Sequence, residues 1–191
     1  MIYLVDNYDS FTYNLYQLLA QQTETPIQVI KNDEMTAEQL LAAHPEAVVY
    51  SPGPGRPADA GAMSSMIAAL AGKVPQFGVC LGMQAMAEYE GAQITPAPVL
   101  MHGMTDPMRR VGDSVLLADC PASFPAARYH SLVATDIPQQ LTVTAYGSDD
   151  SVMAIEDNRL KLYGVQFHPE SIMTPEKVGA QILRDFLATI A

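Results

Sequence analysis

The sequence predicts a single α/β domain over residues 1–191, with a mostly parallel central sheet, helices on both faces and a smaller β-rich C-terminal part. Three observations support this fold class. Short apolar segments without polar alternation are typical of strands that are buried on both faces. These segments alternate with helical patterns, as in consecutive βαβ units. From about residue 96 the pattern changes to shorter β-rich pieces, but no repeat or interdomain linker divides the chain.

The first half of the chain contains the predicted βαβ units. Phe11, Leu15 and Leu19 recur at helical spacing, and Asp9 or Ser10 can cap the helix that they indicate. The expected strands are 2–5, 26–30, 47–50 and 74–79, and further helices are expected at 36–43, 60–70 and 83–88.

The second half is expected to be richer in strands. Short apolar pieces at 115–117, 141–145 and 152–155 are the candidates, and a turn at 157–159 predicts a hairpin with 160–167. Apolar residues Val178, Ile182 and Phe186 lie on one face of a closing helix over 175–190.

Composition narrows the possible partners. The chain is 49% hydrophobic and 16% charged, which is typical of a globular protein, and its net charge of −11 argues against nucleic acid or an anionic membrane as partner. No signal peptide or membrane span is visible, and two cysteines are too few for a disulfide framework. We therefore expect a cytoplasmic protein.

The four histidines are scattered and no phosphate-binding loop occurs, so we expect neither a metal nor a cofactor.

The segment Gly78-Val79-Cys80-Leu81-Gly82 places a cysteine between two glycines, where a predicted strand gives way to a helix. A nucleophile on such a tight turn needs glycines beside it, because the backbone segments approach closely. A sulfur at a helix N-terminus also lies near unpaired N–H groups, which favour the thiolate. The alternative is a buried core cysteine that happens to be followed by glycine.

A second motif, Gln166-Phe167-His168-Pro169-Glu170, follows another predicted core strand. Residues two apart in an extended chain point to the same side, so the Glu170 carboxylate can lie beside the His168 imidazole and fix its tautomer. A cysteine, a histidine and an orienting acid make up an activated-thiol site. Taken alone the motif could be a solvated turn, but two such motifs at strand ends favour the catalytic interpretation.

The loop Ser51-Pro52-Gly53-Pro54-Gly55 follows a third strand. Prolines restrict its backbone while glycines allow positive φ, so its N–H groups can face a bound anion such as the oxyanion formed by thiolate attack. The N–H groups of Leu81 and Gly82 are the natural second donors. An ordinary βα turn is the alternative. Because ligands bind beyond the carboxyl ends of parallel strands, this loop, Cys80 and His168 are expected to meet at one sheet edge.

Further motifs follow in a recognisable order. They are Asp6-Asn7-Tyr8-Asp9-Ser10-Phe11, the 51–55 loop, Gly78-Val79-Cys80-Leu81-Gly82-Met83-Gln84, Met101-His102-Gly103, Arg128-Tyr129-His130-Ser131-Leu132 and Gly164-Val165-Gln166-Phe167-His168-Pro169-Glu170-Ser171. Together they resemble the class I (triad-type) glutamine amidotransferases over essentially the whole chain. More narrowly, they resemble the small subunit shared by anthranilate synthase and aminodeoxychorismate synthase. Many relatives of this branch have His where this chain has Met83, and Lys where it has Met104.

The resemblance implies a flavodoxin-like amidotransferase fold and a mechanism. Cys80 would attack the side-chain amide of L-glutamine, while His168, oriented by Glu170, moves the protons. Ammonia would pass to a chorismate-binding synthase large subunit, which makes anthranilate for tryptophan biosynthesis. The substrate-binding residues implied by the resemblance are Gly53, Pro54, Gly55, Leu81, Gln84, Ser131 and Leu132.

Three alternatives stay open. The partner could instead be the aminodeoxychorismate synthase of 4-aminobenzoate and folate biosynthesis, or one subunit could serve both synthases. The chain could also be a free-standing cysteine hydrolase or γ-glutamyl peptidase on the same fold. A non-catalytic scaffold is the third, although a scaffold has no need of Cys80, His168 and Glu170 together.

Overall fold

The computed structural model describes residues 1–190 and contains two β-sheets. The larger sheet has nine strands. In spatial order these are β2 (Ile27–Lys31), β1 (Ile2–Asp6), β3 (Ala47–Tyr50), β4 (Gln76–Val79), β11 (Leu162–Val165), β10 (Val152–Asp157), β9 (Thr142–Tyr146), β6 (Met104–Arg110) and β7 (Ser123–Arg128). The smaller sheet pairs β5 (Gln93–Pro96) with β8 (Leu132–Thr135).

The large sheet joins a parallel half to an antiparallel half. Strands from β2 to β11 are parallel to their neighbours, and β10, β9, β6 and β7 extend the sheet with antiparallel pairs. The hairpin predicted around 157–159 is confirmed, since Asp157 of β10 pairs with Leu162 of β11. The predicted α/β fold class, with its β-rich C-terminal part, is confirmed as well.

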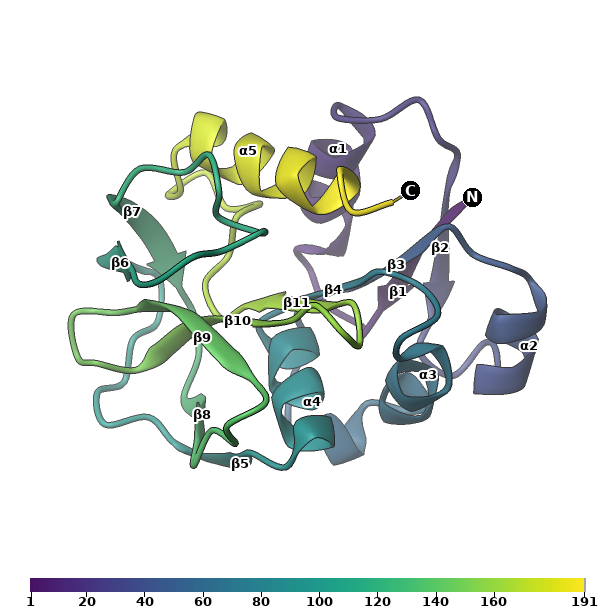
Figure 1. Cartoon of the computed structure of the whole chain (residues 1–191), viewed down its shortest axis with the longest axis horizontal. Coiled ribbons are helices and arrows are strands. Elements are labelled where there is room, and N and C mark those ends of the chain that lie inside the picture. The colour runs from purple at the N-terminus through teal and green to yellow at the C-terminus, as the bar shows by residue number, and fades with distance from the viewer. Residues whose placement is uncertain (191) are drawn as a thin grey trace.

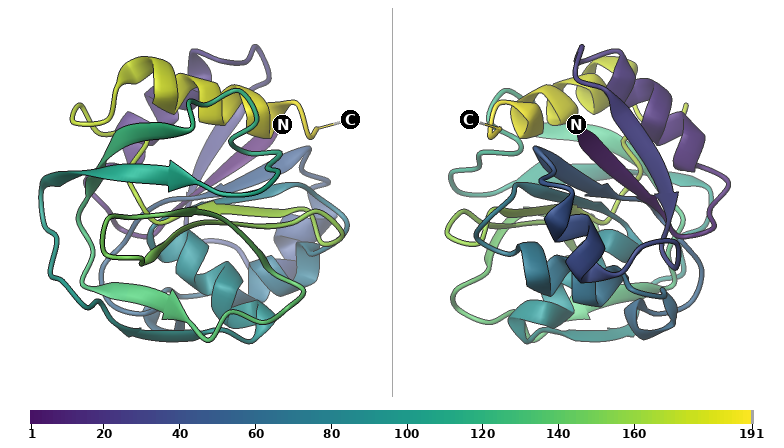
Figure 2. Two further views of the ribbon diagram at one scale, coloured as in Figure 1. Left: turned by 60° about the vertical axis from the view of Figure 1, so that its left-hand side comes forward. Right: turned by 90° about the vertical axis from the view of Figure 1, so that its right-hand side faces the viewer.

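Helices cover the sheet on two faces (Figures 1 and 2). One face carries α1 (Thr12–Ala20) and α5 (Glu176–Leu187), and the other carries α2 (Ala37–Ala42), α3 (Met63–Leu70) and α4 (Leu81–Glu90). Alternate residues of β1 belong to different cores, because Leu4 packs in the cluster with α1 and α5 while Val5 packs in the cluster with α3 and α4. This two-sided burial explains why the parallel strands lack polar alternation.

The structure differs from the sequence prediction in two of the predicted elements. The 60–70 helix starts later, at Met63, after a 3₁₀ turn (Pro57–Asp59). The strand predicted at 115–117 is wrong, because these residues form a turn. The Glu156 carboxylate accepts the N–H groups of Val115 and Leu116 at 3.0 and 2.9 Å, so a side chain satisfies backbone groups that a strand would pair with a neighbour.

The hydrophobic pattern of the sequence also did not predict four strands, namely β5, β6, β7 and β8. Within residues 1–190, no helix combines the length and the apolar character that crossing a bilayer requires.

Candidate active site

Cys80 lies in the strained turn between β4 and α4, with φ 53° and ψ −100°. Such a backbone conformation is costly for a residue with a side chain and is found mainly at functional sites. The two flanking glycines are required by space. A Cβ on Gly78 would lie 2.4 Å from the carbonyl carbon of Gly82, and one on Gly82 would lie 2.8 Å from the Tyr50 Cβ. The turn therefore has the geometry of a nucleophile elbow.

The backbone around His168 is held from two sides. Its N–H donates to the Ala127 carbonyl at 2.9 Å, and its carbonyl accepts from the Thr174 hydroxyl at 2.7 Å. The imidazole Nδ1 and the Glu170 Oε1 are 2.7 Å apart, as the spacing predicts. With the carboxylate at Nδ1, the neutral ring carries its proton there and leaves Nε2 as the basic nitrogen.

The electrostatic environment favours a charged imidazole. Burial acts to lower the pKa of His168, but the Glu170 charge and the Cys80 sulfur outweigh it, and the pKa lies well above its usual value. Because Nδ1 faces Glu170, Nε2 is the ring nitrogen left for a second partner. Nε2 is buried and makes no hydrogen bond within residues 1–190. It is available to exchange a proton with Cys80, and such catalytic hydrogen bonds commonly tighten only when substrate binds.

Cys80 and His168 line one cavity of about 380 Å³. Aromatic side chains form its walls around the imidazole, since the Tyr129 and Phe11 rings lie edge-on to it at centroid distances of 5.0 and 5.6 Å. These rings hold the imidazole in one orientation and reduce its access to water.

Cys80 also lines a smaller, adjoining cavity of about 210 Å³, a size that suits a small metabolite rather than a large ligand. Six of the seven predicted substrate-binding residues line it, namely Gly53, Pro54, Gly55, Gln84, Ser131 and Leu132. Leu81 does not line it. Its side chain instead packs behind the loop, where a Cβ on Gly53 would lie 2.8 Å from the Leu81 Cδ2. The remaining lining residues are His102, Tyr129 and His130.

The 51–55 loop is fastened to the first motif of the chain. The Asn7 N–H donates to the Ser51 hydroxyl at 2.9 Å, and the Asn7 side-chain amide donates to the Ser51 carbonyl at 2.8 Å. Gly55 adopts a positive φ of 75°, as expected for a glycine in this loop. The first N–H groups of α4, beginning at Leu81, have no partner within the helix, although Leu81 itself lines neither cavity.

Comparison with known proteins decides the family. The family model described as "Glutamine amidotransferase class-I" matches residues 3–190. The chain is a class I glutamine amidotransferase. "Anthranilate synthase component 2" of Azospirillum brasilense is 44% identical over 192 residues, covering 99% of this chain and 96% of that protein. "Aminodeoxychorismate/anthranilate synthase component 2" of Bacillus subtilis is 42% identical, covering 99% and 96%.

A solved structure supports the fold of this amidotransferase independently. The crystal structure of a glutamine amidotransferase from Thermotoga maritima superposes with a TM-score of 0.83 and covers 99% of this chain and 96% of that chain. Its sequence identity is 15%, so the agreement concerns the fold alone.

Met83 fills a gap in the amidotransferase core. The side chain is fully buried in α4, and a Cβ on Gly164 of β11 would lie 2.8 Å from its Cγ. The absence of a side chain at Gly164 therefore makes room for Met83 behind the elbow.

Sequence reasoning assigned no role to Gln166 or Arg128, although both lie in the motifs noted above. Gln166 is fully buried, and its amide Nε2 lies 3.4 Å from the Cys80 sulfur. The alternation that paired His168 with Glu170 also puts Gln166 on that side, and a polar residue at the end of a buried strand was the available signal. Arg128 is fully buried as well, and its guanidinium pairs with Asp106 and Asp149.

His130 has a structural environment that keeps it neutral. Burial, together with the Arg128 charge, lowers its pKa to about 4. Arg128 Nε–H donates to His130 Nε2 at 3.1 Å, so Nδ1 carries the proton and donates to the Leu132 carbonyl at 2.9 Å. His130 therefore fixes the backbone of the cavity wall rather than exchanging protons with substrate.

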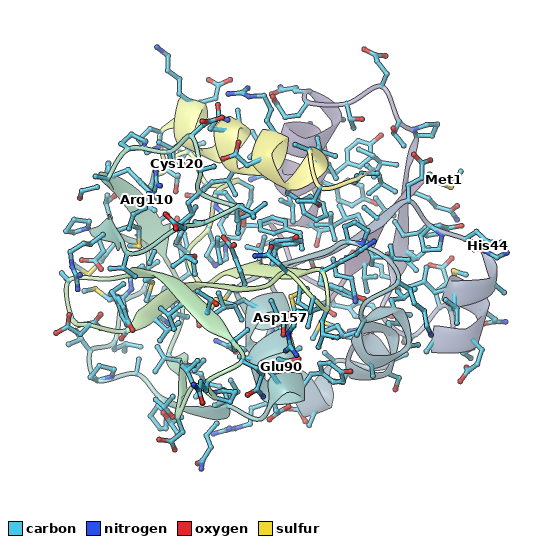
Figure 3. The ribbon with its side chains drawn as sticks, viewed as in Figure 1. Met1, His44, Glu90, Arg110, Cys120 and Asp157 are labelled. Carbon is cyan, nitrogen blue, oxygen red and sulfur yellow. The ribbon has the colours of Figure 1, made fainter. Side chains whose placement is uncertain are left out.

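The two cysteines of the amidotransferase differ in environment. Both are free, and Cys120 lies next to Arg110 (Figure 3). Burial and the Asp185 carboxylate raise the pKa of Cys120 to about 12, which leaves that thiol unreactive. Within residues 1–190, no group of three or more His, Cys, Asp or Glu side chains is arranged to hold a metal ion.

Proposed function

We propose that this amidotransferase hydrolyses L-glutamine through a Cys80 thioester and delivers the ammonia to a separate chorismate-using synthase subunit, which forms anthranilate. The observation that carries the proposal is the shared cavity of Cys80 and His168, with Glu170 on the far side of the imidazole. The amidotransferase family supports glutamine as the substrate, and the names of the Azospirillum brasilense and Bacillus subtilis relatives support the choice of synthase.

The proposed reaction begins with proton transfer from the Cys80 thiol to His168 Nε2. The thiolate attacks the side-chain amide carbon of glutamine, and backbone N–H groups of Leu81 and the 51–55 loop stabilise the oxyanion. His168 then protonates the amide nitrogen, the C–N bond breaks, and ammonia leaves the γ-glutamyl thioester. In the second half His168 takes a proton from water and hydroxide attacks the thioester carbon. The C–S bond then breaks, glutamate leaves, and His168 returns the proton to the Cys80 sulfur.

Glutamine recognition is assigned to the smaller cavity. The Gln84 amide nitrogen already donates to the Leu132 carbonyl at 3.1 Å and to Gln166 Oε1 at 3.0 Å, so its two hydrogens are used. Its own Oε1 is left as an acceptor for an N–H group of the substrate. The Ser131–Leu132 backbone and the loop at Gly53, Pro54 and Gly55 supply the remaining contacts.

Aminodeoxychorismate synthase is the second candidate partner. The name of the Bacillus subtilis relative includes both synthases, aminodeoxychorismate synthase and anthranilate synthase. We propose anthranilate synthase first, because the Azospirillum brasilense relative bears that name alone at 44% identity.

We further propose that residues 1–191 act as one amidotransferase domain in a reducing cytoplasm, where the two free cysteines are stable.

The experiment reconstitutes this chain with a chorismate-using large subunit and follows products from chorismate. Wild type should use glutamine, and its glutamine hydrolysis should rise when the large subunit is added. The Cys80→Ser variant should lose glutamine-dependent synthesis and keep synthesis from free ammonium. Equal glutaminase turnover with and without the large subunit would overturn the coupling and favour a free-standing hydrolase. Formation of aminodeoxychorismate instead of anthranilate would identify aminodeoxychorismate synthase as the partner.

A further inference from the structure

Gln166 brings a neutral hydrogen-bond donor to the sulfur of the elbow. The residue follows β11 directly, its backbone N–H donates to the Met153 carbonyl at 2.9 Å, and its side chain has no exposed surface. The amide Nε2 is 3.4 Å from Cys80 Sγ, a normal length for a hydrogen bond to sulfur. Cys80 thus contacts this amide and shares a cavity with the His168 imidazole.

The orientation of the Gln166 amide follows from its partners. A backbone carbonyl can only accept, so the side-chain group of Gln84 that faces Leu132 O must be its nitrogen. The same nitrogen lies 3.0 Å from the Gln166 amide, which must therefore present its oxygen to Gln84. The Gln166 nitrogen consequently points at Cys80.

The chain of hydrogen bonds continues to a buried ion pair. Arg128 can only donate, and its bond to His130 fixes the imidazole so that Nδ1–H donates to the Leu132 carbonyl. Arg128 is itself held by Asp106 at 2.7 Å and by Asp149 at 3.0 Å. Each donor and acceptor from Arg128 to Cys80 is thereby assigned.

We propose that Gln166 is a further catalytic residue, whose amide N–H stabilises the Cys80 thiolate, and that Gln84 locks the amide in the donating orientation. The proposal rests on the proposed function, in which Cys80 is the nucleophile. A donor aimed at sulfur favours the thiolate over the thiol, because hydrogen bonds to a charged acceptor are stronger than those to a neutral one. The amide is neutral, so it does not compete with His168 for the proton.

The test measures alkylation of Cys80 by iodoacetamide in the free protein between pH 6 and pH 10. A Cys120→Ala background leaves one thiol. Gln166→Met and Gln166→Leu remove the donor while keeping a side chain of similar volume. The matched control is Gln76→Met, because Gln76 is a fully buried glutamine of neighbouring β4 that bonds Tyr50 and the Ile67 carbonyl and does not touch Cys80. Thermal unfolding identifies any variant that fails to fold.

The proposal predicts that each folded Gln166 variant is alkylated about tenfold more slowly than wild type at pH 7, in proportion to the lost stabilisation of the thiolate. The difference should shrink toward high pH, where every protein carries the thiolate, and Gln76→Met should match wild type. Folded Gln166 variants with the wild-type profile would overturn the proposal. So would a slowing by the same factor at all pH values, which indicates altered access to the sulfur. If one variant does not fold, the other decides.

Glutamine hydrolysis by the same samples separates this proposal from the proposed function. If the wild-type protein hydrolyses glutamine but the Gln166 variants are alkylated at the wild-type rate, only the role of Gln166 is contradicted. If the Gln166 variants show the pH-dependent slowing of alkylation but the wild-type protein does not hydrolyse glutamine, only the proposed function is contradicted.

Discussion

The backbone N–H of Cys80 donates to the carbonyl of Val165 at 2.8 Å. This bond continues the parallel pairing of β4 with β11, in which Val79 lies opposite Val165. Two motifs separated by more than eighty residues thus leave the sheet at the same edge, as expected for the carboxyl ends of parallel strands. The meeting of Cys80 and His168 is a consequence of strand order.

Replacing Glu170 with Gln should weaken the base without removing it. The variant keeps the shape of the side chain but loses the charge that raises the pKa of His168. We expect kcat for glutamine hydrolysis to fall by about 10²-fold or more, and the pKa of the His168 ring, followed by NMR, to fall as well. Glu176→Gln, an exposed change at the start of α5, is the control and should alter neither. An unchanged His168 pKa in Glu170→Gln would contradict the assignment.

Gly78→Ala should displace the elbow. The added Cβ would lie 2.4 Å from the Gly82 carbonyl carbon, so the start of α4 must move and carry the sulfur with it. A misplacement of about 1 Å can cost on the order of 10² in rate, and we expect at least that loss in kcat/KM. Gly112→Asn serves as control, because Gly112 has open space around it and Asn tolerates its positive φ of 64°. Full activity in Gly78→Ala would show that the close approach is not required.

Arg128→Lys should destabilise the whole fold. Lysine cannot reproduce the two parallel bonds to Asp149 and the bond to Asp106, which leaves buried carboxylates without a full partner. We expect a loss of about 3 kcal/mol in the free energy of unfolding, measured with urea. Arg109→Lys changes an exposed arginine whose pair with exposed Asp150 spans 3.3 Å, and it should cost less than about 0.5 kcal/mol. Equal losses for the two variants would contradict a special role for the buried network.

His130 should make the fold sensitive to acid. Its pKa is about 4 in the folded protein and near 6.5 when unfolded, so the unfolded chain binds the proton more readily between these values. The contribution to stability is present above pH 6.5 and is lost as the pH falls toward 4, by about 3 kcal/mol in total. His130→Gln should flatten this part of the pH–stability curve, and His44→Asn, at an exposed position, should not. Parallel curves for wild type and His130→Gln would disprove the linkage.

Local patterns were sufficient to predict the parallel half of the sheet. Apolar runs such as 47–50 are buried on both faces there, and the glycines around Cys80 mark a turn whose close contacts leave no room for Cβ atoms. The antiparallel half was harder to predict. Strand β6 contains Pro107 and two adjacent arginines, and β7 contains Ser123, Pro125 and Arg128, so neither has a long apolar run.

The contact between His168 and Glu170 could be predicted, because the chemistry and the spacing are local there. Gln166 and Arg128 were missed because their roles depend on partners far along the chain, namely Cys80 for Gln166 and Asp106 with Asp149 for Arg128. The strand prediction for 115–117 was wrong for the same reason, because N–H groups of this segment donate to Glu156, about forty residues away. Local patterns mark a residue such as Gln166 as unusual, but they do not identify its distant partner.

Mass spectrometry of the protein quenched in acid during turnover with L-glutamine tests the central claim most directly. The account predicts a γ-glutamyl adduct on the peptide that contains Cys80, absent from the peptide that contains Cys120 and absent altogether from Cys80→Ser. Glutamate release that persists in Cys80→Ser, or an adduct on any other residue, would contradict it.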